Sequence, residues 1–256
     1  MPAVPNAMSR LFLFLFSILK FGKLLGTGGT MLIAMALYAL VFGWKYAVGF
    51  VLMLFIHELG HFIAARKRGL RAGLPTFIPF LGAWTELKDQ PHDAETEAFV
   101  GLGGPLLGTV AALACYWAAR NWELSWLLAV AYSGFFLNLI NLIPVSPLDG
   151  GRIMAVVSPR IWLLGAPIIV YMAWRSFSPI WLIIGIFAVP YVLQALRFDR
   201  QSAEHRAYYD VPMKTRWEYA GYYLLLLVFL AVMVNEVNGQ LAHLGAPPAA
   251  SAAGTV

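Results

Sequence analysis

The stretch Val51-Leu52-Met53-Leu54-Phe55-Ile56-His57-Glu58-Leu59-Gly60-His61-Phe62-Ile63-Ala64-Ala65 decides the fold. It holds the pattern His-Glu-x-x-His inside a run of apolar residues. On a helix, residues four apart lie on one face, separated by roughly 6 Å along the axis. Two imidazoles at this spacing can bind one Zn²⁺, with Glu58 beside them as a general base. The apolar flanks predict that this chemistry takes place within a membrane.

The composition of the whole chain agrees with a membrane location. Hydrophobic residues make up 60% of the 256 residues and charged residues 12%, about half the charged share of a soluble domain. The net charge of +5 is explained better by cationic loops that orient a protein in a bilayer than by nucleic-acid binding. We therefore expect the lipid bilayer, and no nucleic acid, as a partner. The single Cys115 excludes an internal disulfide.

Stretches with few or no charged side chains mark the expected membrane spans, because each can supply a helix that crosses the hydrocarbon core. We expect seven spans, at residues 24–44, 46–66, 98–119, 124–148, 161–175, 176–196 and 217–235. Residues 8–22 are short and contain Lys20, so we expect an interfacial helix there, with a true span or an uncleaved signal as the alternative. The predicted fold class is an all-α polytopic membrane protein.

The distribution of Lys and Arg predicts the orientation of these spans. A basic cluster, Arg66-Lys67-Arg68, follows the histidine motif, so that end of its helix is expected to be cytoplasmic. Alternating the spans then places most Lys and Arg residues on the cytoplasmic side and puts Lys45, Arg120 and Arg175 outside. We expect a multi-pass protein of a bacterial or archaeal-type cell membrane, with its active site near the cytoplasmic side.

The connection between the second and third spans is expected to be a re-entrant or interfacial loop. Between Leu74 and Trp84 the chain is apolar, but Pro75, Pro79 and Gly82 interrupt it. A spanning helix does not tolerate these interruptions well. Irregular backbone at membrane depth requires protein or water to satisfy its polar groups.

The third ligand of a zinc site is expected to be Asp149. A catalytic zinc site has three protein ligands and one open position. Asp149 follows the uncharged run 124–148 and lies at the same predicted depth as the two histidines. Prolines before it and glycines after it are expected to stop the helix and turn the carboxylate inward. Without the histidines, an aspartate before a glycine pair would be interpreted as a turn residue.

The two motifs together resemble the site-2 protease family of intramembrane zinc metalloproteases. That family pairs His-Glu-x-x-His with Asn-x-x-Pro-x-x-Pro-x-Asp-Gly-Gly two spans later, and the second pattern here is residues 141–151. The resemblance implies that His57, His61 and Asp149 bind Zn²⁺ and that Glu58 is the catalytic acid/base.

The resemblance also implies that Asn141 helps to position the substrate backbone. The alternative is that Asn141 caps the broken helix end or bonds across helices. Asn138, one turn earlier, is expected to be structural. The resemblance further implies that residues 74–88 form a membrane-embedded loop or hairpin near the substrate. We expect this segment to pair with an unwound substrate strand by edge addition, with Gly82 allowing close backbone approach.

The resemblance covers roughly residues 24–196 and extends to the glycine-proline motif at 103–108. It predicts a compact form without the PDZ or CBS domain of many relatives. We expect four parts: an N-terminal interfacial segment (1–23), an intramembrane metalloprotease core (24–196), a cytoplasmic segment with the final transmembrane helix (197–236) and a disordered tail (237–256).

The expected function is zinc-dependent hydrolysis of peptide bonds in or near the transmembrane segments of membrane-anchored protein substrates. A metal-binding membrane transporter or a catalytically inactive membrane chaperone is the alternative. Glu58 argues against the alternative, because transport needs ligands but no base beside them. A regulatory membrane partner is also expected, and the sequence does not identify it.

Overall fold

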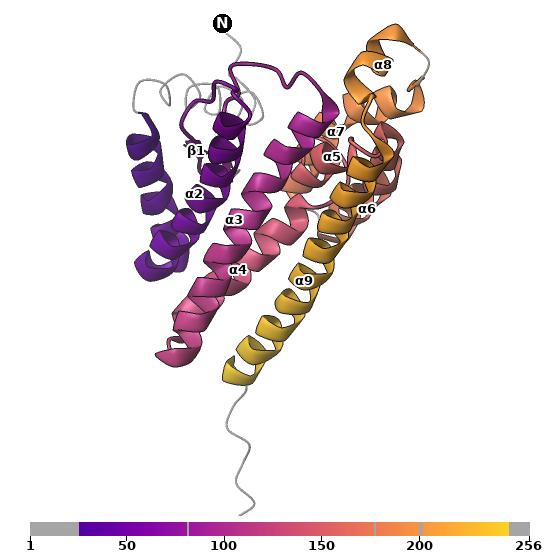
Figure 1. Cartoon of the computed structure of the whole chain (residues 1–256). Coiled ribbons are helices and arrows are strands. Elements are labelled where there is room, and N and C mark those ends of the chain that lie inside the picture. Colours follow the sequence, from indigo (N-terminus) through magenta and orange to yellow (C-terminus); the bar gives the residue numbers. More distant parts are fainter. Residues whose placement is uncertain (1–25, 81, 177, 200–201, 246–256) are drawn as a thin grey trace, which may run out of the picture.

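The computed structural model describes residues 26–80, 82–176, 178–199 and 202–245. Long helices run side by side through most of the molecule (Figure 1). In chain order the elements are a helix Gly26–Phe42, here called the 26–42 helix, then α2 (Trp44–Lys67), β1 (Thr76–Ile78), β2 (Gly82–Trp84), α3 (Ala94–Asn121), α4 (Ser125–Asn141), α5 (Asp149–Met154), the 3₁₀ helix η1 (Pro159–Ile161), α6 (Trp162–Ser176), α7 (Pro179–Leu196), α8 (Ala203–Tyr209) and α9 (Met213–Gly245).

Four of the described helices, α2, α3, α7 and α9, are long and apolar enough to cross a membrane. The 26–42 helix and α4 are shorter apolar helices, and α6 has 15 residues. Each predicted span overlaps a helix, so the mostly helical, membrane-helix character of the chain is confirmed. The count of seven crossings stays a prediction, because three of the seven helices are shorter than a usual span.

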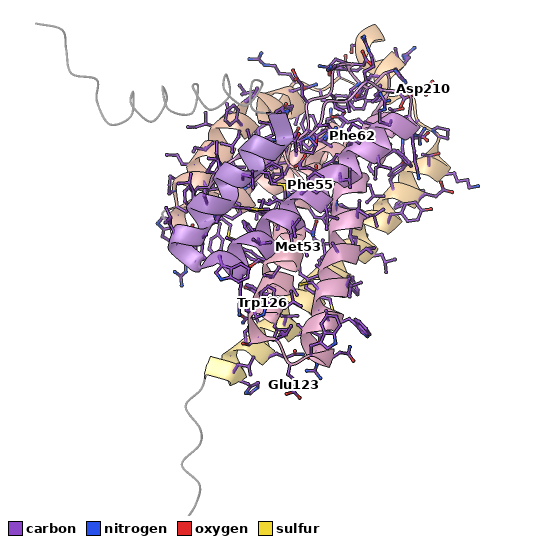
Figure 2. All side chains as sticks on the ribbon, turned by 90° about the vertical axis from the view of Figure 1, so that its left-hand side faces the viewer. Met53, Phe55, Phe62, Glu123, Trp126 and Asp210 are labelled. Carbon is purple, nitrogen blue, oxygen red and sulfur yellow. The ribbon has the colours of Figure 1, made fainter. Side chains whose placement is uncertain are left out.

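The two ends of the helix bundle differ in their contents. The loop that leads into α3 lies at the same end as α8, and the C-terminal end of α9 lies at the other (Figure 1). Along α2, Phe62, Phe55 and Met53 follow one another between these ends, with Asp210 at one end and Glu123 at the other (Figure 2).

Helices α2 and α3 meet at glycines. A Cβ on Gly60 would overlap the backbone of Gly103, and a Cβ on Gly103 would overlap Gly60 and the side chain of Ala64. Small residues allow helix backbones to approach closely in a membrane protein. This contact fixes the helix that carries the histidine motif against α3.

Helix α4 ends at Asn141, earlier than the predicted end of the span at residue 148. Pro144 and Pro147 lie in the following turn and cannot continue the helical hydrogen bonding. The new helix α5 begins at Asp149, whose side chain is buried. The prolines therefore place Asp149 inside the bundle, as the sequence indicated.

Residues 74–88 contain a β-hairpin, which adds two strands to the predicted all-α fold. Strands β1 and β2 are antiparallel, and Phe77 pairs with Ala83. Phe77 is fully buried and joins a hydrophobic cluster with residues of the 26–42 helix and α2. Gly82 has φ +113°, a conformation that favours glycine. A hairpin satisfies the backbone polar groups that a re-entrant segment must not leave unpaired.

Helix α9 continues to Gly245, so the predicted disordered tail from residue 237 is wrong for residues 237–245. The Gln240 amide donates hydrogen bonds to Glu236 (2.8 Å) and to the hydroxyl of Tyr116 on α3 (2.9 Å). These contacts extend the helix beyond its apolar part. The predicted interfacial segment 1–23 and residues 246–256 lie outside the described residues.

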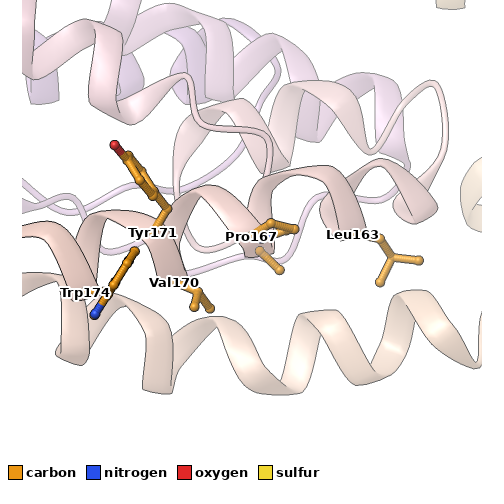
Figure 3. Close-up of a pocket in the computed structure, with 6 residues that line it drawn as sticks. Leu163, Pro167, Val170, Tyr171 and Trp174 are labelled. Carbon is orange, nitrogen blue, oxygen red and sulfur yellow. The ribbon is translucent and has the colours of Figure 1, made fainter.

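The outer surface of α6 carries a shallow apolar groove with a volume of about 550 Å³. Its lining includes no charged side chain and fits a surface in contact with lipid tails. Figure 3 shows the residues that line it: Leu163, Ala166, Pro167, Val170, Tyr171 and Trp174.

Candidate metal centre

Three side chains that could bind a metal converge between α2 and α5. Nε2 of His57 lies 3.2 Å from Oδ2 of Asp149, and Nε2 of His61 lies 3.2 Å from Oδ1 of the same carboxylate. The two Nε2 atoms are also 3.2 Å apart. The side chains belong to residues that are only 3%, 5% and 6% exposed. Within the described part of the chain, they are the one cluster of this kind that could hold a metal ion.

The geometry of this triangle fits a zinc ion. Zn²⁺ binds nitrogen and oxygen ligands at about 2.0–2.2 Å in a tetrahedral arrangement, which places neighbouring ligand atoms roughly 3.3–3.6 Å apart. The observed spacing is close to that value. Two imidazoles and a carboxylate are also a ligand set of catalytic zinc sites, which keep a fourth position open.

The tautomers of both histidines support the same conclusion. Nδ1 of His57 lies 2.8 Å from Oδ1 of Asn138, and Nδ1 of His61 lies 2.8 Å from the carbonyl oxygen of Val100. Both partners are acceptors, so each Nδ1 carries the proton and each Nε2 of the neutral ring keeps its lone pair. Two lone pairs and a carboxylate face one another, an arrangement that a shared cation stabilises.

Asn138 therefore does more than the structural role expected from the sequence. Its Nδ2 donates to the carbonyl of Gly134 (2.7 Å), which orients Oδ1 toward His57. A Cβ on Gly108 would overlap the Asn138 amide. The glycine on α3 thus makes room for the side chain that holds His57.

His61 depends on α3 in a similar way. A Cβ on Gly104 would overlap the imidazole of His61. The ring occupies this space and donates to the Val100 carbonyl one turn earlier on the same helix. Helix α3 itself begins at a capped end, because the Asp93 side chain accepts from the Thr96 amide at 2.6 Å.

Glu58 follows His57 directly on α2 and is 9% exposed. Its backbone carbonyl accepts a hydrogen bond of 3.4 Å from the hydroxyl of Thr85, the residue after β2. The hairpin therefore contacts the turn of α2 that holds both Glu58 and the first histidine.

The loop that carries Asp149 is compact because of its two glycines. A Cβ on Gly150 would overlap the carbonyls of Leu142 and Ile143, and a Cβ on Gly151 would overlap the backbone of Ser146. The Asp-Gly-Gly sequence thus brings α5 back against the end of α4.

Side chains from later helices hold this loop through its backbone carbonyls. Trp162 Nε1 donates to the Gly151 carbonyl (2.8 Å), and the Tyr223 hydroxyl donates to the Leu142 carbonyl (2.6 Å). The Leu142 carbonyl lies at the end of α4, where carbonyls lack intrahelical donors, and Tyr223 supplies one. The Gly151 carbonyl already accepts from the Ala155 amide (3.0 Å), so Trp162 adds a second donor there. Sequence reasoning missed both, because tryptophan and tyrosine in an apolar chain resemble interface anchors.

Arg216 at the start of α9 adds a further connection. Its guanidinium donates to the carbonyls of Val157 (2.8 Å), Tyr209 (2.6 Å) and Val211 (2.9 Å). It is 7% exposed. The guanidinium ties the segment after α5 to α8 and α9. In the sequence, the available signal was only an arginine directly before the last predicted span.

A polar network joins α3, α5 and α8 beside the centre. The Glu97 carboxylate accepts from the Tyr208 hydroxyl (2.6 Å) and lies 3.8 Å from Nε of Arg152 on α5. Burial, together with the Glu97 charge, raises the pKa of Tyr208. This network links α8 to the short helix that begins at Asp149.

The two residues predicted to bind substrate are not among the three potential ligands. The Asn141 amide donates to the carbonyl of Leu137 in its own helix (3.1 Å), and its role toward substrate stays a prediction. At Gly82 the structure requires glycine for the positive φ, and a Cβ there would have no neighbour within 4 Å.

A buried triad of two imidazoles and one carboxylate within apolar helices is a ligand set that fits a metalloprotein of the membrane. Residues 45–123 match the model of Peptidase family M50. The resemblance of the chain to the site-2 protease family of zinc metalloproteases is thereby confirmed.

Two curated relatives are named as zinc metalloproteases. The chain is 26% identical over 157 residues to zinc metalloprotease MJ0392 of Methanocaldococcus jannaschii, a match over 58% of this chain and 45% of that protein. It is 33% identical over 75 residues to the probable chloroplastic zinc metalloprotease EGY1 of Arabidopsis thaliana, over 27% of this chain and 14% of that protein. The chain therefore matches less than half the length of either relative.

A solved structure of a site-2 protease from Methanocaldococcus jannaschii aligns with 65% of this chain and 85% of that chain. The TM-score is 0.44 and the sequence identity is 20%.

Proposed function

We propose that this protein is a zinc-dependent intramembrane protease that hydrolyses peptide bonds in or near the transmembrane segments of membrane-anchored proteins. The observation that carries the proposal is the triangle formed by His57, His61 and Asp149, buried in an apolar helix bundle with Glu58 beside it. The names of the two zinc metalloprotease relatives support zinc as the metal.

In this proposal the two histidines and Asp149 hold Zn²⁺ and keep one position open. Zinc held by these residues would supply a water of lowered pKa and a Lewis acid for the scissile carbonyl. Glu58 takes a proton from the attacking water and passes it to the leaving amine. Asn138 and the Val100 carbonyl keep the imidazoles in the tautomer that binds metal.

The substrate is proposed to bind as an extended strand at the outer edge of β2. A transmembrane helix hides its carbonyls in hydrogen bonds, so it must unwind locally before hydrolysis. The unwound strand then needs partners for its N–H and C=O groups, and strand addition to a sheet edge supplies them. Thr85 places β2 next to Glu58, which supports this choice of edge. Asn141 is proposed to hold the substrate backbone beyond it.

The metal centre is proposed to face the cytoplasmic side of a bacterial or archaeal-type membrane. The end of α2 that carries Arg66, Lys67 and Arg68 supports this orientation. Single cysteines introduced at Ser202 and Lys45 in a Cys115→Ala background test it. Both sites should react with an impermeant maleimide, but from opposite faces of the membrane, and reaction from one face would contradict the topology.

The proposal as a whole is tested with purified protein in liposomes that also contain a single-span reporter protein. The wild-type chain should hold about one zinc per chain and cleave the reporter. Glu58→Gln should retain zinc and lose cleavage by at least about a thousandfold, because the amide cannot accept the proton. Glu86→Gln, in an exposed loop position, is the matched control and should cleave normally.

Two outcomes would contradict the proposal. Cleavage by Glu58→Gln within about tenfold of wild type would remove Glu58 from the acid–base role. Zinc binding with no cleavage of any reporter, together with zinc flux across the liposome membrane, would establish transport instead.

A further inference from the structure

The 26–42 helix makes two side-chain contacts with the backbone of the β-hairpin. The Phe77 amide in β1 donates to the Thr30 hydroxyl oxygen at 3.2 Å. The Phe80 amide in the turn donates to the Tyr38 hydroxyl oxygen, also at 3.2 Å. Both acceptors belong to buried residues, which are 3% and 8% exposed.

Thr30 is committed to its acceptor role by its own helix. Its hydroxyl proton can be donated to the carbonyl of Gly26 (3.2 Å) or of Thr27 (3.1 Å). The oxygen therefore presents a lone pair to the Phe77 amide. The Thr30 hydroxyl is already hydrogen-bonded within its own helix, so the contact with Phe77 satisfies a backbone amide of the hairpin.

Tyr38 is fixed by its ring. The ring centroid lies 5.2 Å from that of Phe50 on α2 and 5.1 Å from that of Phe80 in the hairpin turn. Phe77 lies in the same hydrophobic cluster as Tyr38. The helix, α2 and the hairpin are thus packed together around the two hydrogen bonds.

The register of the hairpin determines which backbone groups remain at its edges. In an antiparallel pair, hydrogen-bonded and non-hydrogen-bonded residue pairs alternate. The Phe77 amide points to Thr30, so Phe77 and Ala83 form a non-hydrogen-bonded pair. The N–H and C=O of Ala83 then point away from β1, toward the outer edge of β2.

We propose that Thr30 and Tyr38 are positioning residues: Thr30 occupies the outer edge of β1 and Tyr38 holds the adjoining turn, so that a substrate strand can add only to β2 through Ala83. An open hairpin has two edges available for strand addition, and the 26–42 helix covers the one that is remote from Glu58. This inference rests on the proposed function for the identity of the added strand. The occupied edge itself can be tested without any substrate.

The first experiment measures amide hydrogen exchange of the full chain in nanodiscs, with fragmentation to single residues. Thr30→Val keeps the shape of the side chain and removes the acceptor, and Thr30→Ser is the matched control. Thr30→Val should raise the exchange rate of the Phe77 amide about tenfold, and Thr30→Ser should leave it within twofold. Equal exchange rates of the Phe77 amide in the wild type, Thr30→Val and Thr30→Ser would overturn the inference that Thr30 occupies the β1 edge.

The second experiment measures cleavage kinetics of the single-span reporter. The double variant Thr30→Val/Tyr38→Phe should raise KM about tenfold with kcat and zinc content nearly unchanged, because only the binding edge is displaced. The single variant Thr30→Ser, with Tyr38 unchanged, keeps the hydroxyl acceptor and should have the wild-type KM. A fall in kcat with an unchanged KM would overturn the positioning role, even if the exchange experiment succeeds.

The two experiments separate this inference from the proposed function. A wild-type chain that cleaves no membrane protein contradicts the protease proposal, and the exchange rates then still decide whether the 26–42 helix occupies the β1 edge. A cleaving chain in which the Phe77 amide is insensitive to Thr30→Val contradicts only the present inference.

Discussion

Oδ1 of Asn138 lies 2.8 Å from Nδ1 of His57, so a residue of α4 sets the ring orientation of a potential metal ligand on α2. Partners of this kind fix the tautomer of a ligating histidine, and their loss usually reduces metal affinity 10–100-fold. The contact also joins two helices at the depth of the metal centre, so the geometry of the triangle depends on how α4 packs.

Asn138→Leu should weaken zinc binding by about 10–100-fold, because the side chain keeps its volume and loses the acceptor. Competition with a chromophoric chelator measures the affinity. Asn141→Leu is the matched control, since that amide bonds within its own helix, and it should leave the affinity within about threefold. Equal loss in both variants would show that the effect comes from helix packing.

Asp149→Asn should remove most of the zinc from the purified protein. The amide has nearly the same shape, but it is a much poorer ligand than a carboxylate. Elemental analysis should find well under half a zinc per chain, whereas Asp210→Asn, far along the chain, should keep the wild-type content. Full occupancy in Asp149→Asn would mean that the third ligand is another residue.

Tyr223→Phe should lower the free energy of unfolding by about 1–3 kcal/mol, because it leaves the buried Leu142 carbonyl without its donor. Tyr222→Phe is the control, since that side chain is 54% exposed, and it should change stability by less than about 0.5 kcal/mol. Denaturant unfolding in detergent micelles measures the difference. A similar small effect in both variants would argue against a role for Tyr223 in holding the loop.

Ala83→Pro should abolish cleavage of the reporter with zinc content unchanged. Proline removes the N–H that points outward from β2 but leaves the hydrogen bonds between β2 and β1 intact. Edge strands tolerate proline at such a position. Ala83→Val keeps the amide and should retain cleavage within about fivefold. Normal cleavage by Ala83→Pro would exclude strand addition through this residue. Gly82→Val is a less informative change, because valine would be strained at φ +113°.

The pair formed by Arg71 and Asp89 should respond to pH at the surface. Hydrogen bonds from the Arg71 side chain and backbone amide lower the pKa of Asp89 to about 2. Because the folded pKa is depressed, the stability from this pair is complete above the ordinary pKa of 3.8 and is lost as the pH falls through about 2. Arg71→Gln should return the pKa of Asp89 toward its ordinary value in a carboxyl NMR titration, and Arg66→Gln should not.

The ligand triangle and the break in α4 could be predicted from the sequence because each depends on local chemistry. The His57–His61 spacing requires only a helix, and the prolines before Asp149 stop a helix in any context. The supporting residues could not be predicted in this way. Asn138, Trp162 and Tyr223 act through contacts with residues far along the chain, and no local pattern distinguishes them from packing or interface residues.

The resemblance left both a loop and a hairpin open for residues 74–88, and the sequence did not decide between them for a related reason. Three-residue strands are too short to produce a periodic pattern, and β1 depends on Thr30 in a distant helix. The end of α9 was misplaced because hydropathy falls after residue 236, whereas the helix is continued there by hydrogen bonds among polar side chains.

The support that α9 gives to the Asp149 loop has a consequence for biogenesis. A ribosome delivers the two histidines early, Asp149 much later, and Arg216 and Tyr223 last. A nascent chain released before α9 would carry every ligand but lack the donors to the carbonyls of Leu142 and Val157. The hydrogen bonds that hold the Asp149 loop and the segment after it are therefore complete only when translation has passed the start of the final helix.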